Sequence, residues 1–137
     1  MEFFDINDPE IKGRLVAENT LAFAIVTNIP IVPGHVLICT KRHVSKINDL
    51  TGDEIDALLD LQKKLKNAMI KSFGAEGFNY AWNEGEAAGH RVPHIHIHML
   101  PAKNQIQEFS NMSQGSFYTG RVLAPTPRNK SSQKLQS

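Results

Sequence analysis

Two short apolar runs occur near the start of the chain, in the stretch RLVAENTLAFAIVTN at residues 14–28. The polar letters ENT separate the runs, and Asn with Thr between apolar segments favours a turn. We therefore predict a β-hairpin of two antiparallel strands. Pro30, Pro33 and Gly34 then exclude a helix, and the branched run at residues 36–38 predicts a third strand.

The period of the pattern changes to that of a helix after Thr51. Thr51 and Glu54 fit a capping box, in which each residue satisfies a backbone N–H at the start of a helix. Gly74 and Gly77 permit the chain to reverse direction after Phe73. The apolar residues expected on one face of this helix are Ile55, Leu58, Leu59, Leu65, Ala68 and Met69.

Aromatic residues in the next segment, FNYAWNEG at residues 78–85, predict a further strand. Tyr80 and Trp82 could contact a ligand, but alternating aromatic residues on a strand belong more often to a core. We expect both side chains in the core. The following letters, GEAAGHRVP, are typical of a turn.

Histidine alternates with Ile and Met in HIHIHML, residues 94–100. In a strand, successive side chains point to opposite faces. The alternation therefore predicts a strand with His94, His96 and His98 on one face and apolar side chains on the other. Four of the six histidines of the chain lie within residues 90–98.

Length and composition set the frame for this pattern. The 137 residues suffice for one domain, and 15 basic against 14 acidic residues give a net charge of +1, which supports neither a nucleic-acid nor a membrane partner. No apolar run approaches the roughly 20 residues that span a bilayer, and the acidic start MEFFDINDPE is unlike a signal peptide. Cys39, the single cysteine, is expected to be a small buried hydrophobe in a reduced, cytoplasmic protein.

Four interpretations of the histidine face stay open. It could be a solvent-facing strand, a pH sensor, a metal site or a site of covalent catalysis. Side chains two residues apart on a strand lie roughly 6.7 Å apart and can share a metal ion, whereas those four apart lie about 13 Å apart and cannot easily do so. A two-histidine metal site completed by His35 or His90 ranks second.

Covalent catalysis on phosphorus explains most of the pattern. A neutral imidazole attacks a phosphoryl group through one ring nitrogen while the other donates its N–H to a fixed acceptor. His96 lies between two other histidines, which makes it the expected nucleophile. In the adjoining NEGEAAGH, Gly85 and Gly89 permit close backbone approach to a ligand, and Asn83 can donate to phosphoryl oxygens.

HIHIHML also resembles the signature of the histidine-triad family, in which three histidines alternate with apolar residues and two apolar residues follow. The segments PIVPGHVLICTKRHVSKINDL (residues 30–50) and NEGEAAGHRVPH (residues 83–94) are similar to the same family. The resemblance covers roughly residues 14–103. It is closest to the fragile-histidine-triad branch of dinucleoside polyphosphate hydrolases, with Hint-type phosphoramidases as relatives.

This resemblance implies an α+β fold, an antiparallel β-meander sheet with one long helix packed on it and a short N-terminal helix. The domain would span residues 1–103, with a core at 14–103, and residues 104–137 would form a partly flexible C-terminal extension. The resemblance also implies a homodimer. No cofactor is required, although Mg²⁺ could accompany the phosphates of the substrate.

The family pattern also implies roles for single residues. His96 matches the nucleophile that forms a nucleotidyl-histidine intermediate, and His94 matches the residue that orients it. His98 matches the residue that contacts phosphate and assists the leaving group. His35 matches a position behind the site that helps to fix the triad, and Asn83 a phosphate-contacting amide.

The chain departs from the family pattern at several positions. His90 stands where the family usually has Gln, so that phosphate binding or leaving-group assistance could depend on pH. Thr27, with Asn28 beside it, stands where an Asn or Asp usually holds the ribose hydroxyls, and Thr cannot bind them bidentately. Pro101 is followed by Ala102 in place of a common Arg.

Three functions follow from the sequence. The first is a nucleotide hydrolase or nucleotidyl transferase that cleaves dinucleoside polyphosphates or related nucleotides at the α-phosphate, with a nucleoside phosphoramidase as the alternative enzyme. The second is a nucleotide-sensing module with slow turnover. The third is a metalloprotein that uses two of the histidines.

Overall fold

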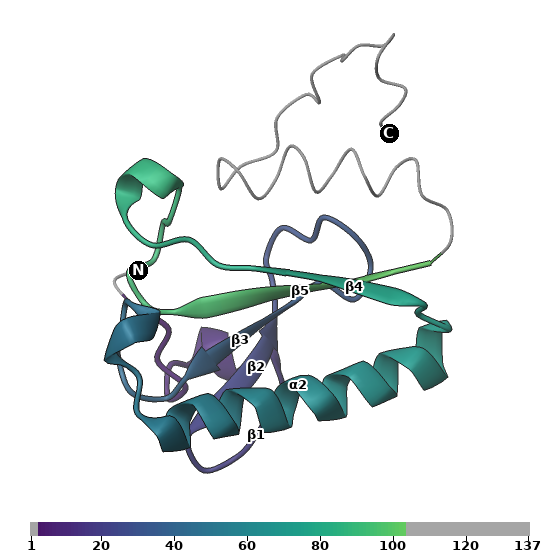
Figure 1. Ribbon diagram of the computed structural model, residues 1–137, viewed down its shortest axis with the longest axis horizontal. Coiled ribbons are helices and arrows are strands. Elements are labelled where there is room, and N and C mark those ends of the chain that lie inside the picture. The colour runs from purple at the N-terminus through teal and green to yellow at the C-terminus, as the bar shows by residue number, and fades with distance from the viewer. Residues whose placement is uncertain (1–2, 104–137) are drawn as a thin grey trace, which may run out of the picture.

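Five strands form one antiparallel sheet in the computed structural model, which describes residues 3–103 (Figure 1). The spatial order is β1-β2-β3-β5-β4. The long helix α2 lies across one face of this sheet, and the short helix α1 packs on the other. The elements are α1 (Pro9–Lys12), β1 (Leu15–Glu18), β2 (Ala22–Val26), β3 (Val36–Thr40), α2 (Gly52–Phe73), β4 (Gly77–Ala81) and β5 (His96–Ala102), with 3-10 turns η1 (Ile47–Asp49) and η2 (Glu86–Ala88).

The first three strands confirm the predicted hairpin and third strand. Asn19 makes the tight turn between β1 and β2, because its side-chain oxygen accepts the N–H groups of Leu21 and Ala22 at 3.1 and 2.9 Å. Strand β3 continues the meander, and β5 then pairs with β3 and β4, between which it lies. The predicted α+β fold, with a long helix and a short N-terminal helix, is confirmed.

Helix α2 begins and ends where the sequence predicts. Thr51 and Glu54 form the capping box, and Gly74 ends the helix in the left-handed conformation, with φ of 68°. The prediction for its apolar face is partly wrong: Ile55 and Leu59 are 41% and 54% exposed. The apolar residues of the helix cover a wider part of its surface than the part that packs against the sheet. The buried apolar positions of the helix are Ala57, Leu58, Leu61, Leu65 and Met69, whereas Ala68 is exposed.

Each face of the sheet has its own core. Helix α2 packs against one face of β2 and β3, including Ala24 and Ile38. The opposite face carries Phe23 and Leu37, and the N-terminal segment covers it through residues such as Phe4 and Ile11. Because alternate strand residues point to opposite faces, β5 contributes Met99 to the first core and its histidines to the second face.

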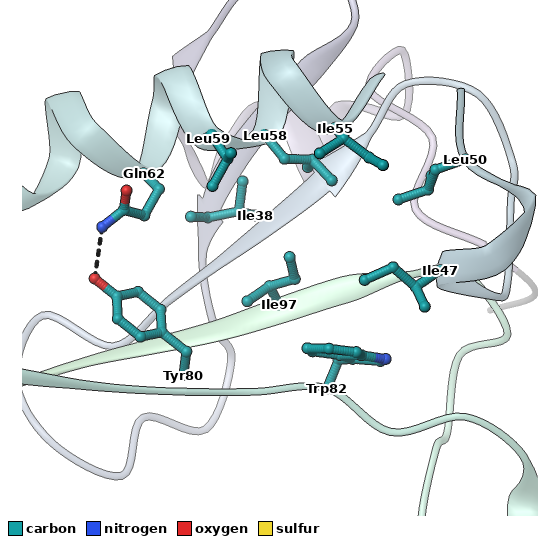
Figure 2. A pocket seen from close by; sticks show the side chains of 10 residues that line it. All are labelled: Ile38, Ile47, Leu50, Ile55, Leu58, Leu59, Gln62, Tyr80, Trp82 and Ile97. Atoms are coloured by element: carbon teal, nitrogen blue, oxygen red, sulfur yellow. Dashed lines mark hydrogen bonds between the residues drawn. The ribbon is translucent and has the colours of Figure 1, made fainter. Parts of the chain in front are cut away.

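The prediction that Tyr80 and Trp82 belong to the core is wrong, because each is 42% exposed. Tyr80 lies on β4, which is an edge strand with one neighbour, and Trp82 follows the end of that strand. Together with Ile55 and Leu59 they border an apolar groove between α2 and the sheet (Figure 2). Gln62 closes part of the groove by donating to the Tyr80 hydroxyl at 2.7 Å.

The predicted C-terminal extension, residues 104–137, lies outside the described residues. Among the helices that the structure does describe, none is long and apolar enough to cross a membrane.

Candidate active site

His96 opens strand β5 and faces away from helix α2. It pairs with Cys39 of β3, and His98 pairs with Leu37, so the two imidazoles lie on the same face of the sheet, with ring centroids 5.3 Å apart. The Nδ1 atom of His96 lies 2.7 Å from the carbonyl oxygen of His94. A carbonyl only accepts, so Nδ1 carries the ring proton and Nε2 carries the lone pair.

His94 does not lie on the strand, so the prediction of a three-histidine strand face is wrong at this position. Strand β5 begins two residues later, and the preceding segment is held by a hydrogen bond from the N–H of Ile95 to the carbonyl of Val44 at 2.6 Å. The ring of His94 is 1% exposed and turns into the protein. Its Nε2–H donates to the carbonyl of Thr40 at 2.7 Å, and its Nδ1 accepts the N–H of Phe4 at 2.9 Å.

His98 and His35 form a second hydrogen-bonded pair. The N–H of Ile31 donates to Nδ1 of His35 at 3.2 Å, which places the His35 proton on Nε2. That Nε2 lies 2.9 Å from Nδ1 of His98 and donates to it. The proton of His98 is therefore on Nε2, and the hydrogen bond from His35 fixes this tautomer. The supporting role in the reaction that the resemblance gives to His35 stays a prediction.

Burial keeps these imidazoles neutral at physiological pH. Desolvation lowers the pKa of His35 and of His94 to about 4 and that of His98 to about 3. Desolvation also lowers the pKa of His96, although its hydrogen bond to the His94 carbonyl opposes this effect, and the nearby His90 lowers it further. A neutral ring with one fixed proton is the state that a nucleophilic histidine requires.

The loop before the triad is closed upon itself by His90. The N–H of Gly85 donates to Nδ1 of His90 at 2.6 Å, and the N–H of His90 donates to the carbonyl of Gly85 at 3.3 Å. Asn83 braces the same loop by donating to the carbonyl of Ala88 at 2.7 Å. Gly89 adopts φ of 95°, a conformation that favours glycine. The phosphate contacts expected of Asn83, Gly89 and His90 stay predictions.

The expected ribose-binding residues, Thr27 and Asn28, follow the end of β2. Thr27 is half-buried and Asn28 is exposed. The hydroxyl of Thr27 accepts the N–H of Ile29 at 3.4 Å, and the N–H of Thr27 lies 3.5 Å from the carbonyl of His35. The turn is therefore adjacent to the His35 side of the site, and its ribose contact stays a prediction.

Cys39 is opposite His96 on the neighbouring strand but is not a second nucleophile. It is fully buried, and burial raises the pKa of its thiol. Within residues 3–103, no group of three or more His, Cys, Asp or Glu side chains is placed to hold a metal ion.

Two contacts of the site have no local signal in the sequence. Phe4 and Thr40 lie 90 and 54 residues before His94, and each contributes a backbone group to its ring. Backbone partners of this kind depend on the path of the chain rather than on residue type.

Comparison with known proteins agrees with this geometry. A HIT domain matches residues 8–105. A bis(5'-adenosyl)-triphosphatase from Dictyostelium discoideum is 37% identical over 75% of this chain and 68% of its own. A bis(5'-nucleosyl)-tetraphosphatase from Schizosaccharomyces pombe is 39% identical over 68% of this chain and 51% of its own. An adenosine 5'-monophosphoramidase from the same organism is 32% identical over 69% of this chain and 71% of its own.

Solved structures give the same result. A diadenosine triphosphate hydrolase from Plasmodium falciparum superposes with a TM-score of 0.65 and 31% identity, over 69% of this chain and 64% of that one. The present chain thus spans between about half and about 70% of the length of these relatives. The HIT domain matches residues 8–105, and hydrogen bonds join His96 to the carbonyl of His94 and His98 to His35. The chain therefore belongs to the histidine triad (HIT) family.

Proposed function

We propose that this protein is a nucleotide hydrolase that cleaves a dinucleoside polyphosphate or a related nucleotide at its α-phosphate. The observation that carries the proposal is the 2.7 Å hydrogen bond from His96 Nδ1 to the His94 carbonyl. This bond leaves a lone pair on Nε2 of a buried, neutral ring. The hydrolases of diadenosine and other dinucleoside polyphosphates among the relatives support the same substrate class.

The reaction has two steps that share one covalent bond. The lone pair of His96 Nε2 attacks the α-phosphorus, a bond forms between Nε2 and phosphorus, and the phosphoanhydride bond breaks to release a nucleoside phosphate. Water then attacks the same phosphorus and loses a proton to the solvent, the bond to Nε2 breaks, and a nucleoside monophosphate leaves. Splitting the displacement in this way returns the ring to its starting state.

His98 assists by donating a hydrogen bond rather than by giving up its proton. Its Nε2–H can bind the phosphoryl oxygens or the leaving oxygen, where negative charge develops. A released phosphate is a stable anion and needs no proton, whereas an amine leaving group must acquire one. A neutral imidazole is a weak acid, and this supports phosphoanhydrides rather than phosphoramidates as the proposed substrates.

The loop from Asn83 to His90 and the turn at Thr27 and Asn28 complete the proposed nucleotide site. Nδ1 of His90 accepts the Gly85 N–H, so the proton of its neutral ring lies on Nε2, which can donate to phosphate as an amide would. Mg²⁺ would enter only with the substrate phosphates. The cytoplasmic location remains a prediction.

A substrate panel tests the proposal. It contains dinucleoside polyphosphates, adenosine phosphoramidate and nucleotide sugars, and the mononucleotide released from each is identified. We expect turnover of at least one dinucleoside polyphosphate, and faster turnover of adenosine phosphoramidate would assign the phosphoramidase instead. A single-turnover measurement in which product release is far slower than cleavage would favour the sensing module.

A matched pair of variants tests the covalent step. We expect His96→Asn to bind nucleotide but to lose turnover, and acid-quenched wild-type protein to show the mass of a nucleotidyl adduct on the peptide that contains His96. Unimpaired hydrolysis by His96→Asn would refute the mechanism. Stoichiometric transition metal in protein purified without an affinity tag would revive the metalloprotein hypothesis.

We further propose that the protein is a homodimer that uses the groove of Figure 2. Strand β4 pairs with β5 on one side, and no described strand pairs with its other side. Six of the exposed large apolar side chains lie on α2, on β4 or directly after β4. Helix α2 is acidic in its first half and basic in its second, so a two-fold axis would pair opposite charges. The six side chains are Ile55, Leu59, Ile70, Phe73, Tyr80 and Trp82.

Sedimentation velocity tests the dimer. Leu59→Ser with Trp82→Ser should dissociate it, whereas Val16→Ser, which removes an exposed apolar side chain from β1, should leave it intact. A wild-type protein that sediments as a monomer at micromolar concentration would overturn this part of the proposal.

A further inference from the structure

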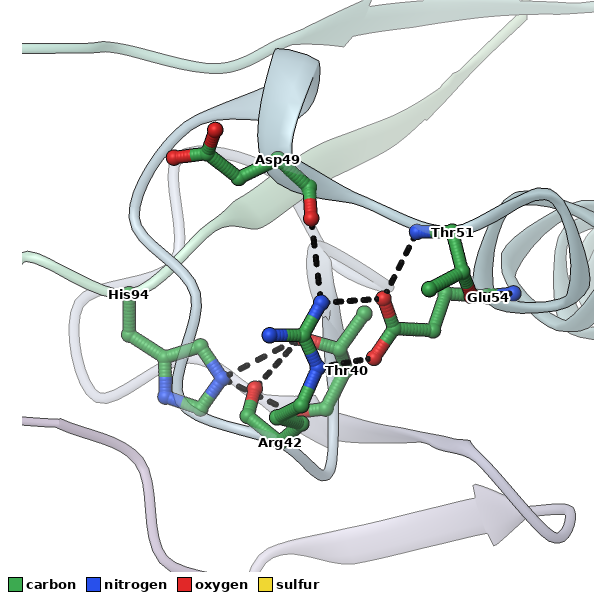
Figure 3. A network of polar contacts seen from close by, with 6 residues as sticks. All are labelled: Thr40, Arg42, Asp49, Thr51, Glu54 and His94. Atoms are coloured by element: carbon green, nitrogen blue, oxygen red, sulfur yellow. Dashed lines mark hydrogen bonds and ion pairs between the residues drawn. The ribbon is translucent and has the colours of Figure 1, made fainter.

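A turn after strand β3 connects the start of helix α2 with His94 (Figure 3). Thr40, at the end of β3, is fully buried. Its hydroxyl donates to the carbonyl of Arg42 at 2.8 Å, which fixes the turn. Its own carbonyl accepts the Nε2–H of His94 at 2.7 Å. The direction of this carbonyl therefore depends on the geometry of residues 40–42.

Arg42 is fixed in turn by a two-pronged contact with Glu54. Its Nε and Nη2 atoms lie 2.8 and 2.7 Å from the two carboxylate oxygens, and Nη2 also donates to the carbonyl of Asp49 at 3.0 Å. Glu54 is only 4% exposed and accepts the N–H of Thr51 at 2.9 Å. Paired contacts of this kind fix the orientation of the guanidinium as well as its position.

The ring of His94 is held by a hydrogen bond at each of its two nitrogens. Thr40 holds its Nε2 and the N–H of Phe4 holds its Nδ1, so the buried ring has one possible tautomer and little freedom to rotate. The carbonyl of the same residue accepts the Nδ1–H of His96. A shift of the His94 ring moves this peptide, and with it the acceptor that orients the nucleophile.

Resting on the proposed role of His96 as nucleophile, we infer that Thr40, Arg42 and Glu54 are positioning residues for the reaction. They fix the Thr40 carbonyl, which fixes the His94 ring, whose peptide carbonyl orients His96. The hydroxyl of Thr40 is the link that joins the outer ion pair to the inner hydrogen bonds. A support of this length matters because small misplacements of reacting groups reduce rates strongly.

Steady-state kinetics on conservative variants tests this inference. Thr40→Val removes the hydroxyl but keeps the branched shape, and we expect kcat to fall about fivefold, the rate equivalent of one neutral hydrogen bond, with KM changed by less than about twofold. Thr40→Ser retains the hydroxyl and should restore kcat. Arg42→Lys keeps the charge but loses the two-pronged contact, and should lower kcat in the same way.

Leu65→Ala provides the control for lost stability. This side chain is buried in the core under α2, away from the turn, so its removal should destabilise the fold while kcat per folded molecule stays unchanged. In the double variant Thr40→Val with Arg42→Lys, kcat should fall by less than the product of the two single effects. The reason is that both changes interrupt the same series of contacts from Glu54 to His94. Full additivity, or a loss no greater than that of Leu65→Ala, would overturn the inference.

Ring tautomers measured by long-range ¹H–¹⁵N NMR need no turnover and so separate the two proposals. The wild type should show His94 protonated at Nε2 and His96 at Nδ1, and Thr40→Val should mix the tautomers of one or both rings. Wild-type tautomers in both Thr40→Val and Arg42→Lys would refute the positioning role. If the wild type cleaves no nucleotide but the tautomers still respond, the proposed function fails and the structural coupling stands.

Discussion

Acidification from pH 7 to pH 5 should destabilise this fold through its buried histidines. In the unfolded chain a histidine titrates near 6.5, whereas in the folded protein the pKa values of His35, His94 and His98 are lowered to about 4, about 4 and about 3. Between these limits the unfolded state binds protons that the folded state does not. The free energy of unfolding is therefore greatest above pH 6.5 and falls as the pH decreases towards 4.

The magnitude follows from the linkage between protonation and folding. A histidine whose pKa falls from 6.5 to about 4 on folding loses at most about 1.8 kcal/mol of stability between pH 7 and pH 5. This figure depends little on the folded pKa, since at pH 5 the folded ring is still mostly neutral. With His98 partly exposed and therefore partly screened, we expect about 4 kcal/mol for the three rings together. Small domains have a total stability of about 5–15 kcal/mol, so the effect is large.

Urea unfolding at pH 7, 6 and 5 measures this effect, with Trp82 fluorescence as the probe and the protein concentration held constant. Glu54 does not contribute to this change, because its hydrogen bond with Arg42 lowers the pKa of its carboxyl to about 2 and the stability gained in this way is lost only below pH 4.5. His35→Gln provides the matched variant, since an amide can accept and donate as the neutral ring does. Between pH 7 and pH 5, the free energy of unfolding of His35→Gln should decrease by about 1.5 kcal/mol less than that of the wild type.

A wild-type free energy of unfolding that changes by less than about 1 kcal/mol between pH 7 and pH 5 would refute this reasoning. Such a result would mean that the buried rings bind protons in the folded state, which contradicts the neutral tautomers assigned from their hydrogen bonds.

Other predictions follow from single positions. Gly34 adopts φ of 89°, and a Cβ there would lie 2.8 Å from the Phe73 ring. Gly34→Ala should therefore lower the free energy of unfolding by about 1–3 kcal/mol, and an unchanged urea midpoint would contradict this. Cys39 should resist iodoacetamide in the folded protein and react only after denaturation, because burial raises the pKa of its thiol; rapid native labelling, detected by mass spectrometry, would argue against a closed core. His35→Leu removes the donor to His98 and should lower kcat at least about fivefold while nucleotide binding persists, and wild-type kcat in this variant would exclude a role for the pair.

Local patterns in the sequence predicted the elements well. Asn19 lies in the turn of the predicted hairpin, and the Thr51 and Glu54 capping box and Gly74 define the two ends of α2. Each of these features depends on residues within a few positions of one another, so the chemistry that forms them is visible in a short stretch. The alternation of side chains along a strand likewise predicts His96 and His98 on one face, because it involves only neighbouring positions.

Features that depend on distant parts of the chain could not be predicted. The exposure of Tyr80 follows from the position of β4 at the edge of the sheet, and the alternation of side chains is the same for an edge strand and a central one. His94 continues the alternating pattern but lies before the start of the strand, and backbone groups of Phe4 and Thr40, far away in the sequence, bind the two nitrogens of its ring. The coupling of Glu54 to the site crosses 40 residues of sequence through a turn that no motif marks.

The acceptor that orients the proposed nucleophile is a peptide carbonyl, and this has a consequence for how the protein tolerates variation. Catalytic triads that use a carboxylate lose their acceptor when one codon changes. Here every amino acid at position 94 supplies the same oxygen, so substitution there alters only its placement. Saturation mutagenesis of position 94 should therefore yield a graded series of rates that follows backbone displacement, rather than a division into active and inactive enzymes.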